Sequence, residues 1–278
     1  MLVTGRILRE ESFKNLRDFV YEQSGIFIPD TKKYLVEKRL AGRLQVNHLQ
    51  DFDQYMELLH GRRYEEEIGP LLDAITTNET YFFREPEHFT IFSGHIVPEL
   101  VRRNGMKTAI NIWSSACSTG EEPYTLAITL KEKWLGLKFN ILGSDISNST
   151  IESARKGLYN SYSIRNVPEQ YISRYFSFKQ DACGYELSPC IKELVRFMNI
   201  NLVNGRRAGF PMGLDVIFCR NVLIYFDIKS KRRAVSNMYD SLKPGGYLII
   251  GKSEGLHDIT RAFKPVIIDN TIIYQRTM

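Results

Sequence analysis

Small and acidic residues after the apolar run that ends at Trp113 could form a ligand-binding turn. The segment closes on Gly120, and two acids, Glu121 and Glu122, then begin a predicted helix. Small residues let the backbone turn sharply and approach a ligand, and acids complement the positive amino end of a helix. Neither a Gly-x-Gly-x-x-Gly pattern nor a P-loop is present, and carboxylates disfavour a phosphate group at this turn. They suit a positively charged ligand, such as an amine or a sulfonium.

Asp145 is a second candidate, because it ends the next predicted strand. It follows Gly120 by about 25 residues, close to the ~20 residues between the glycine turn and the ribose-binding acid of dinucleotide folds. One ionised carboxylate can accept hydrogen bonds from two neighbouring hydroxyls. Asp145 could instead cap the following helix, a task that Ser147 and Asn148 could share. We favour ligand contact, because both features lie at the carboxyl ends of adjacent strands.

Two further stretches combine polar and apolar residues. Arg220 and Asn221 directly follow a buried apolar run, again at the carboxyl end of a predicted strand. Tyr225 could belong to the same site or could be a core aromatic whose hydroxyl is satisfied. Residues 76–85 mix helix-capping residues and aromatics with Arg84, and alone they would be typical of a helix cap and core.

Short apolar runs alternate with helical stretches from about residue 107 onward. This alternation predicts an α/β domain with a parallel, doubly wound sheet, which binds ligands beyond the carboxyl ends of its strands. Asp269-Asn270 is a turn signal, so the tail is expected to form an antiparallel hairpin at one edge. The expected strands are 109–113, 139–143, 195–198, 215–219, 247–251, 262–268 and 271–275, and the expected helices are 121–135, 147–156 and 229–242.

Two segments lie outside this alternation. Residues 158–193 are rich in tyrosine and too long for a simple connection, so we expect an inserted subdomain that contains a small antiparallel sheet. Residues 1–75 contain many helix formers and hardly any strand-like alternation, which predicts a small helical domain.

The helical domain carries a basic stripe. Lys32, Arg39 and Arg43 fall on one side of the helix predicted after Pro29-Asp30. Such a stripe is usually a solvated helix face. It could also be a docking surface for an acidic partner, and only the rest of the chain can decide between these interpretations.

Composition limits the class of protein. Among 278 residues, 43% are apolar and 25% charged, which excludes disorder and indicates a soluble globular chain. No apolar run approaches the ~18 residues of a membrane span, and the start does not resemble a signal peptide, so no membrane insertion and a cytoplasmic location are expected. The four cysteines lack zinc-like or C-x-x-C spacing, so no metal site is expected. A net charge of +5 does not by itself indicate a nucleic-acid partner.

Five groups of motifs together resemble the chemotaxis-receptor glutamate methyltransferase (CheR) family. They appear in the family's order and span nearly the whole chain. The last of them is also shared widely among methyltransferases that use S-adenosylmethionine. The motifs are Thr77–Thr80 with Phe82–Glu85, Ser118–Tyr124, Asn201-Leu202, Cys219–Val222 with Ile224–Asp227, and Leu242–Tyr247.

The resemblance implies a fold that agrees with the pattern of elements above. It predicts an α/β architecture with a seven-stranded, Rossmann-like, S-adenosylmethionine-dependent methyltransferase domain, a small inserted antiparallel β subdomain and an all-helical amino-terminal domain. The implied domains are a helical domain at 1–75, a linker that contributes to the cofactor site at 76–90, and a methyltransferase domain at 91–278 with its insert at 158–193.

The resemblance also implies roles for individual residues. Arg84 and Tyr225 match the family positions beside the transferred methyl group and are our predicted catalytic residues. Glu121 or Glu122 would lie near the methionine end of the cofactor, with Asp145 on its ribose. The implied cofactor-binding residues are Asn78, Thr80, Arg84, Glu121, Glu122, Asp145, Asn201, Leu202, Arg220 and Asn221.

The activity implied is O-methylation of glutamate side chains on the cytoplasmic helices of chemoreceptors, which gives γ-methyl esters and S-adenosylhomocysteine. A glutamate carboxylate, with a pKa of about 4.3, is ionised at pH 7, so no general base is required. Receptor methylation helices are rich in Glu and Gln, so we expect Lys32, Arg39 and Arg43 to dock the receptor. We expect a monomer.

Three other functions share parts of this pattern. A nicotinamide-dependent oxidoreductase also has a strand, a glycine turn and a downstream acid, but the missing glycine motif and the acids at the turn count against it. A noncatalytic signalling module could keep the fold and bind the cofactor as a ligand. Nucleic-acid methylation is disfavoured, because no strongly basic face with interleaved aromatics is evident beyond the tyrosine-rich insert.

Overall fold

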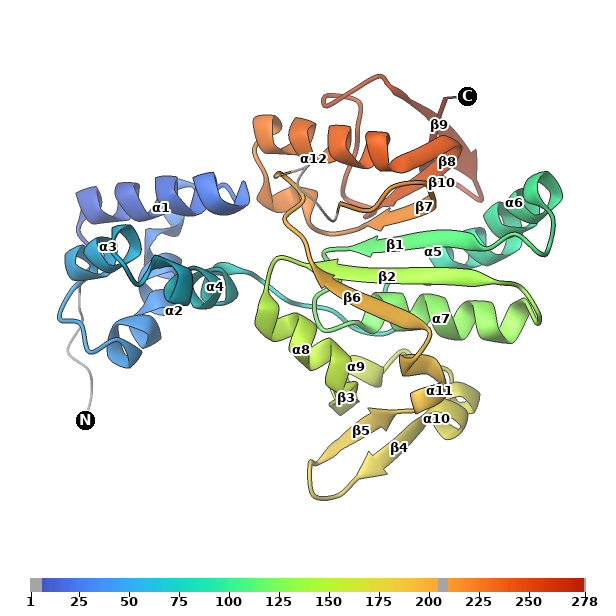
Figure 1. Ribbon diagram of the computed structural model, residues 1–278, viewed down its shortest axis with the longest axis horizontal. Coiled ribbons are helices and arrows are strands. Elements are labelled where there is room, and N and C mark those ends of the chain that lie inside the picture. Colours follow the sequence, from blue (N-terminus) through green and yellow to red (C-terminus); the bar gives the residue numbers. More distant parts are fainter. Residues whose placement is uncertain (1–6, 205–209, 278) are drawn as a thin grey trace.

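The chain folds into a helical domain and a sheet domain joined by a linker (Figure 1). The computed structural model describes residues 7–204 and 210–277, so the first six residues of the predicted helical domain lie outside it. The helical domain contains α1 (Glu10–Ser24), the 3-10 turn η1 (Asp30–Lys32), α2 (Lys33–Val46), α3 (Phe52–His60) and α4 (Tyr64–Ile75).

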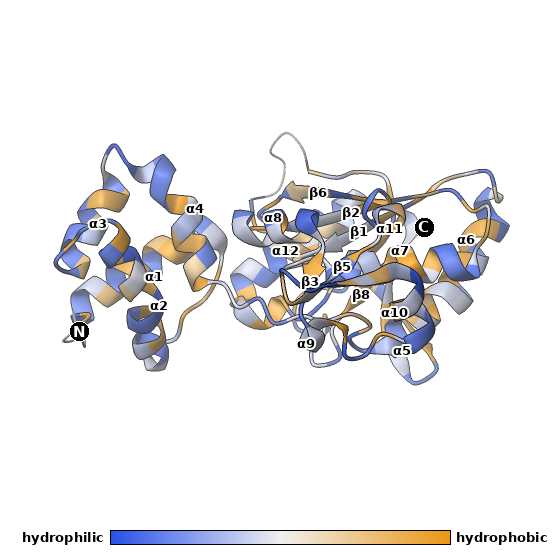
Figure 2. Ribbon diagram, turned by 90° about the horizontal axis from the view of Figure 1, so that it is seen from below, coloured by the Kyte–Doolittle hydropathy of each residue, from blue (hydrophilic) through white to orange (hydrophobic). Residues whose placement is uncertain are grey.

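Apolar residues one turn apart build the core of the helical domain. Leu16 and Val20 on α1, and Leu40 and Leu44 on α2, are fully buried. Side chains at positions i and i+4 lie on one face of a helix, so each helix has one apolar face to bury. Hydrophobic and hydrophilic residues accordingly interchange along these helices in Figure 2. The domain has its own core, separate from the cores of the sheet domain.

A buried carboxylate joins three elements of the helical domain. Glu67 on α4 is only 3% exposed, and it accepts two hydrogen bonds from Arg43 on α2, at 2.8 and 2.6 Å. Tyr55 donates its hydroxyl to Glu67 at 2.7 Å, and Asn47 donates its amide at 3.0 Å. Burial acts to raise the pKa of Glu67, but these hydrogen bonds outweigh burial and lower the pKa below its usual range.

Seven strands form the sheet in the order β6-β2-β1-β7-β8-β10-β9 (Figure 1). The first five are parallel, and β10 is antiparallel to both β8 and β9. The order along the chain reverses at β1, between β2 and β7, and such a reversal opens a crevice at the carboxyl ends of the strands. The strands are β1 (Ile110–Ser115), β2 (Phe139–Asp145), β6 (Val195–Asn199), β7 (Leu214–Cys219), β8 (Leu242–Ile250), β9 (Phe263–Ile268) and β10 (Thr271–Arg276).

Helices cover both faces of this sheet. On one face, Phe89 and Phe92 pack on Phe218 of β7, with ring centroids 5.9 and 5.4 Å apart, in a core that α7 shares. On the other face, Ala234 and Met238 of α12 contribute to a second core. The helices are α5 (Pro86–Ile91), the π-helix η2 (Phe92–Ile96), α6 (Val97–Asn104), α7 (Glu121–Lys133), α8 (Asn148–Lys156) and α12 (Ile228–Ser241), with a 3-10 turn, η3 (Leu223–Tyr225), before α12.

An inserted subdomain lies between α8 and β6. Its three strands form an antiparallel sheet in the order β3-β5-β4, drawn in yellow tones at the bottom of Figure 1. Its elements are β3 (Leu158–Tyr159), α9 (Ser161–Ile164), α10 (Glu169–Tyr175), β4 (Phe176–Lys179), β5 (Gly184–Leu187) and α11 (Pro189–Lys192).

The predicted fold class is confirmed, with a seven-stranded sheet, an amino-terminal helical domain and an inserted antiparallel sheet. The expected edge hairpin turns at Asp269 and Asn270, both with positive φ, as a two-residue hairpin turn of the favoured type requires. Helix α5 begins within residues 76–90, at Pro86, because proline fits the first turn of a helix. One local expectation was wrong. Lys32 ends η1 and precedes the helix that was expected to contain it.

In the described parts of the chain, no helix is both long enough and apolar enough to cross a membrane.

We expect Glu67→Gln to lower the free energy of unfolding by about 2–3 kcal/mol, because it leaves the half-buried Arg43 without a charged partner. Since the folded pKa of Glu67 is lowered, its contribution is present above the unfolded pKa of about 4.3 and is lost as the pH falls through the folded pKa. The difference between wild type and variant should therefore shrink in acid.

Urea unfolding followed by circular dichroism between pH 7 and pH 3 measures this difference. The control is Glu66→Gln, whose ion pair with Arg63 is exposed at both ends and should contribute less than about 0.5 kcal/mol. Equal effects of the two substitutions would contradict a special role for the buried carboxylate.

Candidate functional site

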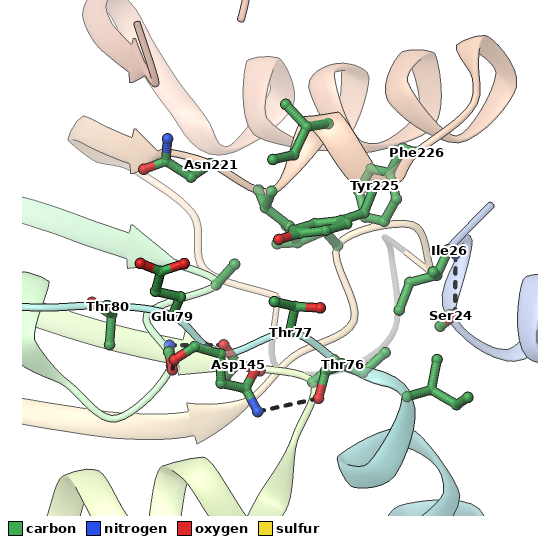
Figure 3. A pocket seen from close by; sticks show the side chains of 18 of the residues that line it. Ser24, Ile26, Thr76, Thr77, Glu79, Thr80, Asp145, Asn221, Tyr225 and Phe226 are labelled. Atoms are coloured by element: carbon green, nitrogen blue, oxygen red, sulfur yellow. Dashed lines mark hydrogen bonds between the residues drawn. The ribbon is translucent and has the colours of Figure 1, made fainter. Parts of the chain in front are cut away.

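A cavity of about 490 Å³ opens at the carboxyl ends of β1, β2 and β7. Residues from three parts of the chain line it: the helical domain, the linker and the sheet domain. In Figure 3 Thr77 of the linker lies between Asp145 below it and Tyr225 above it. The cavity is therefore closed only when both domains and the linker are in place.

The linker crosses the cavity in an irregular conformation. Asn78, Thr80 and Arg84 all line it. Ser118 donates its hydroxyl to the carbonyl oxygen of Asn78 at 3.1 Å, which anchors the linker to the glycine turn. Phe83 and Glu85, on either side of Arg84, have positive φ angles of 57° and 54°. Residues without glycine's freedom adopt this conformation at a cost, so the surrounding contacts must hold the linker in place.

The turn after β1 is as tight as its small residues predicted. Ala116, Ser118 and Gly120 all have positive φ. A Cβ atom on Gly120 would lie 2.9 Å from the Cβ atom of Ala154 on α8, so only glycine fits there. The turn brings the start of α7 to the edge of the cavity.

The structure distinguishes the two glutamates that begin α7. Glu121 is 1% exposed, accepts a hydrogen bond from the Thr119 hydroxyl at 2.7 Å, and is not part of the cavity wall; burial raises its pKa. Glu122 lines the cavity and accepts hydrogen bonds from Ser114 at 2.7 Å and from Arg220 at 2.8 Å. Of the two, Glu122 is placed to meet a ligand.

Asp145 lies on the cavity wall at the end of β2. Its carboxylate accepts hydrogen bonds from the backbone N–H of Ser118 at 2.8 Å and of Ser147 at 3.0 Å, and burial raises its pKa. The cap of α8 is Ser147, whose hydroxyl accepts from the N–H of Thr150. The capping interpretation of Asp145 is therefore wrong. A carboxylate held by two backbone donors keeps further lone pairs for ligand hydroxyls.

Arg220 is the most buried cation of the site, with 2% of its side chain exposed. It pairs with Glu85 at 3.0 Å and with Glu122 at 2.8 Å, and it donates to the carbonyl oxygen of Arg84. Burial acts to raise the pKa of Glu85, but Arg220 outweighs burial, and the pKa is lowered. Burial, and then the charge of Arg220, lower the pKa of His88 to about 4, so His88 is neutral at pH 7.

Three side chains beside this cation could be mistaken for a metal site. Ligand atoms of Glu85, Glu87 and His88 lie within 4.8 Å of one another. Both acids already have cationic partners, since Glu85 pairs with Arg220 and Glu87 pairs with Lys252 at 2.5 Å. The cluster fits an ion-pair network, and the expectation that the chain holds no metal is unchanged.

Glu254 was missed by the sequence analysis, although it organises the loop after β7. Its carboxylate accepts from the backbone N–H groups of Gly251, Asn221 and Ile224, at 2.7, 2.9 and 3.3 Å. Asn221 has a positive φ of 58° and lines the cavity. Glu254 thus fixes the loop that carries Asn221 and Tyr225. A single acid after a predicted strand gives no sequence signal for this role.

The helical domain also reaches the loop that carries Tyr225, which the sequence analysis did not anticipate. The N–H of Phe27 donates to the carbonyl oxygen of Tyr225 at 2.9 Å, and Ile26 and Phe226 form an isolated antiparallel bridge. Beside them, the Tyr21 hydroxyl donates to Asp227. This backbone pairing holds one wall of the cavity against Tyr225.

The remaining predicted cofactor residues lie where the domains meet. Asn201 lines the cavity, but its amide donates to the carbonyl oxygen of Gln23 at 2.7 Å and its side-chain oxygen accepts from the N–H of Val203. Leu202 is buried beside it and also lines the cavity. Every predicted cofactor residue except Glu121 therefore lies on the cavity wall, together with Tyr225.

The predicted basic stripe is largely engaged within the protein. Arg43 pairs with Glu67, and Arg39 donates to the carbonyl oxygen of Ile75 and to the Thr77 hydroxyl. Lys32 lines the cavity and forms no ion pair within the described residues. A free stripe of three cations was expected, but Arg39 and Arg43 have partners within the protein, and Lys32 is the one of the three with no ion pair among residues 7–204 and 210–277.

Known proteins resemble this chain over nearly its whole length. The family profile "CheR methyltransferase, SAM binding domain" matches residues 78–272, and "CheR methyltransferase, all-alpha domain" matches residues 11–76. Chemotaxis protein methyltransferase 2 of Vibrio cholerae is 37% identical over 260 residues, which cover 92% of this chain and 90% of that protein. A chemotaxis protein methyltransferase of Borreliella burgdorferi is 36% identical (89% and 89% covered), and that of Escherichia coli is 33% identical (92% and 88%).

We expect the two neighbouring glutamates to differ in ligand binding. Glu122→Gln should weaken the binding of S-adenosylhomocysteine about tenfold, because Glu122 both lines the cavity and pairs with Arg220. Glu121→Gln should change the dissociation constant of S-adenosylhomocysteine by less than about twofold, because Glu121 does not line the cavity. Isothermal titration calorimetry measures both, and a larger effect of Glu121→Gln would contradict this assignment.

Proposed function

The chain belongs to the CheR methyltransferase family, and we propose that it methylates glutamate side chains on the cytoplasmic helices of chemoreceptors. The products would be glutamate γ-methyl esters and S-adenosylhomocysteine. The observation that carries the proposal is the cavity itself, whose walls hold both Arg84 and Tyr225 together with Asp145 and Glu122. If its substrates are the cytoplasmic helices of chemoreceptors, the protein acts in the cytoplasm.

The residues around the cavity fit the cofactor. Asp145 presents a carboxylate that can accept hydrogen bonds from ribose hydroxyls, and Glu122 offers negative charge to a positively charged ligand. Asn78 and Thr80 would hold the cofactor from the linker side. When bound, S-adenosylmethionine would supply a methyl group on a positively charged sulfur, so that a carboxylate oxygen could gain the methyl group as an ester while the sulfur keeps the electron pair of the broken bond.

The chain's own residues would act by orientation rather than by proton transfer. The acceptor carboxylate is ionised at pH 7, so no base is needed, and alignment and partial loss of water supply the acceleration. Arg84 could hold one carboxylate oxygen by a charge-assisted hydrogen bond, and the Tyr225 hydroxyl could orient the carboxylate. A hydrogen bond also disperses nucleophilic charge, so these two groups must balance orientation against reactivity.

Docking of the receptor is proposed for the mouth of the cavity on the helical domain. Lys32 lines this mouth, and Phe27, also on the cavity wall, is 52% exposed. An acidic helix would be attracted by Lys32. Arg39 and Arg43 would act less directly, because they hold the linker and Glu67. A monomer remains our expectation for the oligomeric state.

Calorimetric titration with S-adenosylhomocysteine tests the pocket. We expect a dissociation constant of about 1 μM or below, weakened at least tenfold by Asp145→Ala because the carboxylate that accepts the ribose hydroxyls is lost. NADH serves as the comparison ligand and should give no binding. Binding of NADH alone would instead support an oxidoreductase, and binding of neither ligand would support a signalling module without the cofactor.

Receptor methylation by Arg84→Ala tests the catalytic assignment. We expect kcat to fall about 100-fold, since orientation of the acceptor carboxylate is lost, while circular dichroism stays unchanged. The backbone oxygen of residue 84 remains available to Arg220, so the linker keeps that contact. Transfer of tritiated methyl groups to receptor-containing membranes gives the rate, with Arg103→Ala, at the distant end of α6, as the control. Near-normal turnover of Arg84→Ala would disprove the assignment.

A further inference from the structure

Arg165 does not line the cavity, yet it is stacked on a tyrosine that does. It follows α9 in the inserted subdomain, and its guanidinium carbon lies 3.5 Å from the ring centroid of Tyr81 and 3.6 Å from that of Tyr162. Tyr81 belongs to the linker and lines the cavity, whereas Tyr162 belongs to α9. At these distances the guanidinium is attracted to both rings by cation–π interactions. Arg165 therefore joins the insert to the linker.

The insert holds the linker on both sides of Tyr81. The Tyr162 hydroxyl donates to Oε1 of Glu79 at 3.1 Å. The N–H of Phe82 donates to the carbonyl oxygen of Ser163 at 2.9 Å, and the ring of Phe82 is fully buried. These contacts hold the side chain of Glu79 before Tyr81 and the backbone of Phe82 after it, and the cation–π contact with Arg165 holds the Tyr81 ring between them.

Arg84 is oriented by the same short stretch of linker. Its Nη1 donates to the carbonyl oxygen of Glu79 at 2.8 Å, and its guanidinium carbon lies 5.8 Å from the centroid of the Tyr81 ring. Glu79 is thus bound through its side chain by Tyr162 and through its backbone by Arg84. Tyr81 likewise meets both Arg165 and Arg84. Glu79 and Tyr81, which orient Arg84, are therefore the same two residues that the inserted subdomain holds.

We propose that Arg165 is a positioning residue for methyl transfer, which clamps Tyr81 against Tyr162 and so fixes the linker turn that orients Arg84. The inference rests on the catalytic role proposed above for Arg84. Arg165 acts through that residue, since it is not part of the cavity wall. The inserted subdomain then contributes to turnover through α9 and the residue after it, independently of its three-stranded sheet.

Removal of the guanidinium should loosen this turn without unfolding the domain. The rings of Tyr81 and Tyr162 lie with centroids 6.4 Å apart at 75°, and the space between them is filled by Arg165. Arg165 itself is exposed, so its loss leaves no buried cavity. Asn78 keeps its separate anchor, the Ser118 hydroxyl, so the cofactor side of the linker stays in place.

Steady-state kinetics of Arg165→Ala test the proposal. We expect kcat to fall about tenfold, because the cation–π contacts to both tyrosine rings are lost, while the KM for S-adenosylmethionine changes by less than about twofold. Arg165→Lys should recover part of kcat, since an ammonium keeps the positive charge but lacks the broad guanidinium group that contacts both rings. An unchanged kcat, or a raised KM with normal kcat, would overturn the proposal.

A double-mutant cycle shows whether Arg165 acts through Arg84. In the Arg84→Ala background, Arg165→Ala should cause no further loss of kcat. If the fold-losses of the two single variants instead multiply in the double variant, the two residues act independently and the proposal is overturned. The matched control is Arg174→Ala on α10 of the same subdomain, whose partner is Glu132 at 2.6 Å. This variant should keep the wild-type kcat.

Hydrogen exchange supplies a readout that does not depend on activity. Arg165→Ala should speed amide exchange in residues 76–85 about tenfold and leave α7 unchanged, and Arg174→Ala should change neither. Unchanged exchange in that segment would refute the clamp. Failure of the wild type to methylate receptors would refute the proposed function instead, and exchange in the linker would still decide whether the clamp exists.

Discussion

A buried cation that must be neutralised determines how the parts of the cavity meet. A guanidinium with almost no exposure to water is stable only where carboxylates and carbonyl oxygens surround it. For Arg220 these come from the start of α7, through Glu122, and from the end of the linker, through Glu85 and the carbonyl oxygen of Arg84. Two segments far apart in the sequence are thereby fixed to the one guanidinium that follows β7, and the linker has one path, across the mouth of the crevice.

The periodic features of the chain were the predictable ones. Parallel strands buried on both faces leave continuous apolar runs, and a glycine turn with a downstream acid leaves a recognisable interval, so the sheet, Gly120 and Asp145 follow from pattern alone. Contacts between distant segments leave no such pattern. Arg43 resembles a solvated charge in the sequence because its partner Glu67 lies 24 residues away, and Glu254 meets its backbone donors only after two loops have come together.

The family resemblance named the residues of the cavity but not the partners that hold them there. Of the two glutamates at the turn, one is buried beneath the helix start and the other faces the cavity, a difference of one position that a motif cannot resolve. Asn201 likewise lies on the wall as expected, yet its amide is bonded to the helical domain. In each case burial and hydrogen bonding, which depend on the whole fold, decide what a motif residue can touch.

Because of the backbone pairing between Phe27 and Tyr225, the helical domain cannot be exchanged between relatives without also changing the cavity. A recombinant that took its helical domain from a relative would also acquire a foreign wall for the cavity, with new side chains beside Tyr225. Residues 24–28 and 225–227 should consequently be inherited as a unit. Chimaeras of this family are best spliced so that both segments come from the same parent.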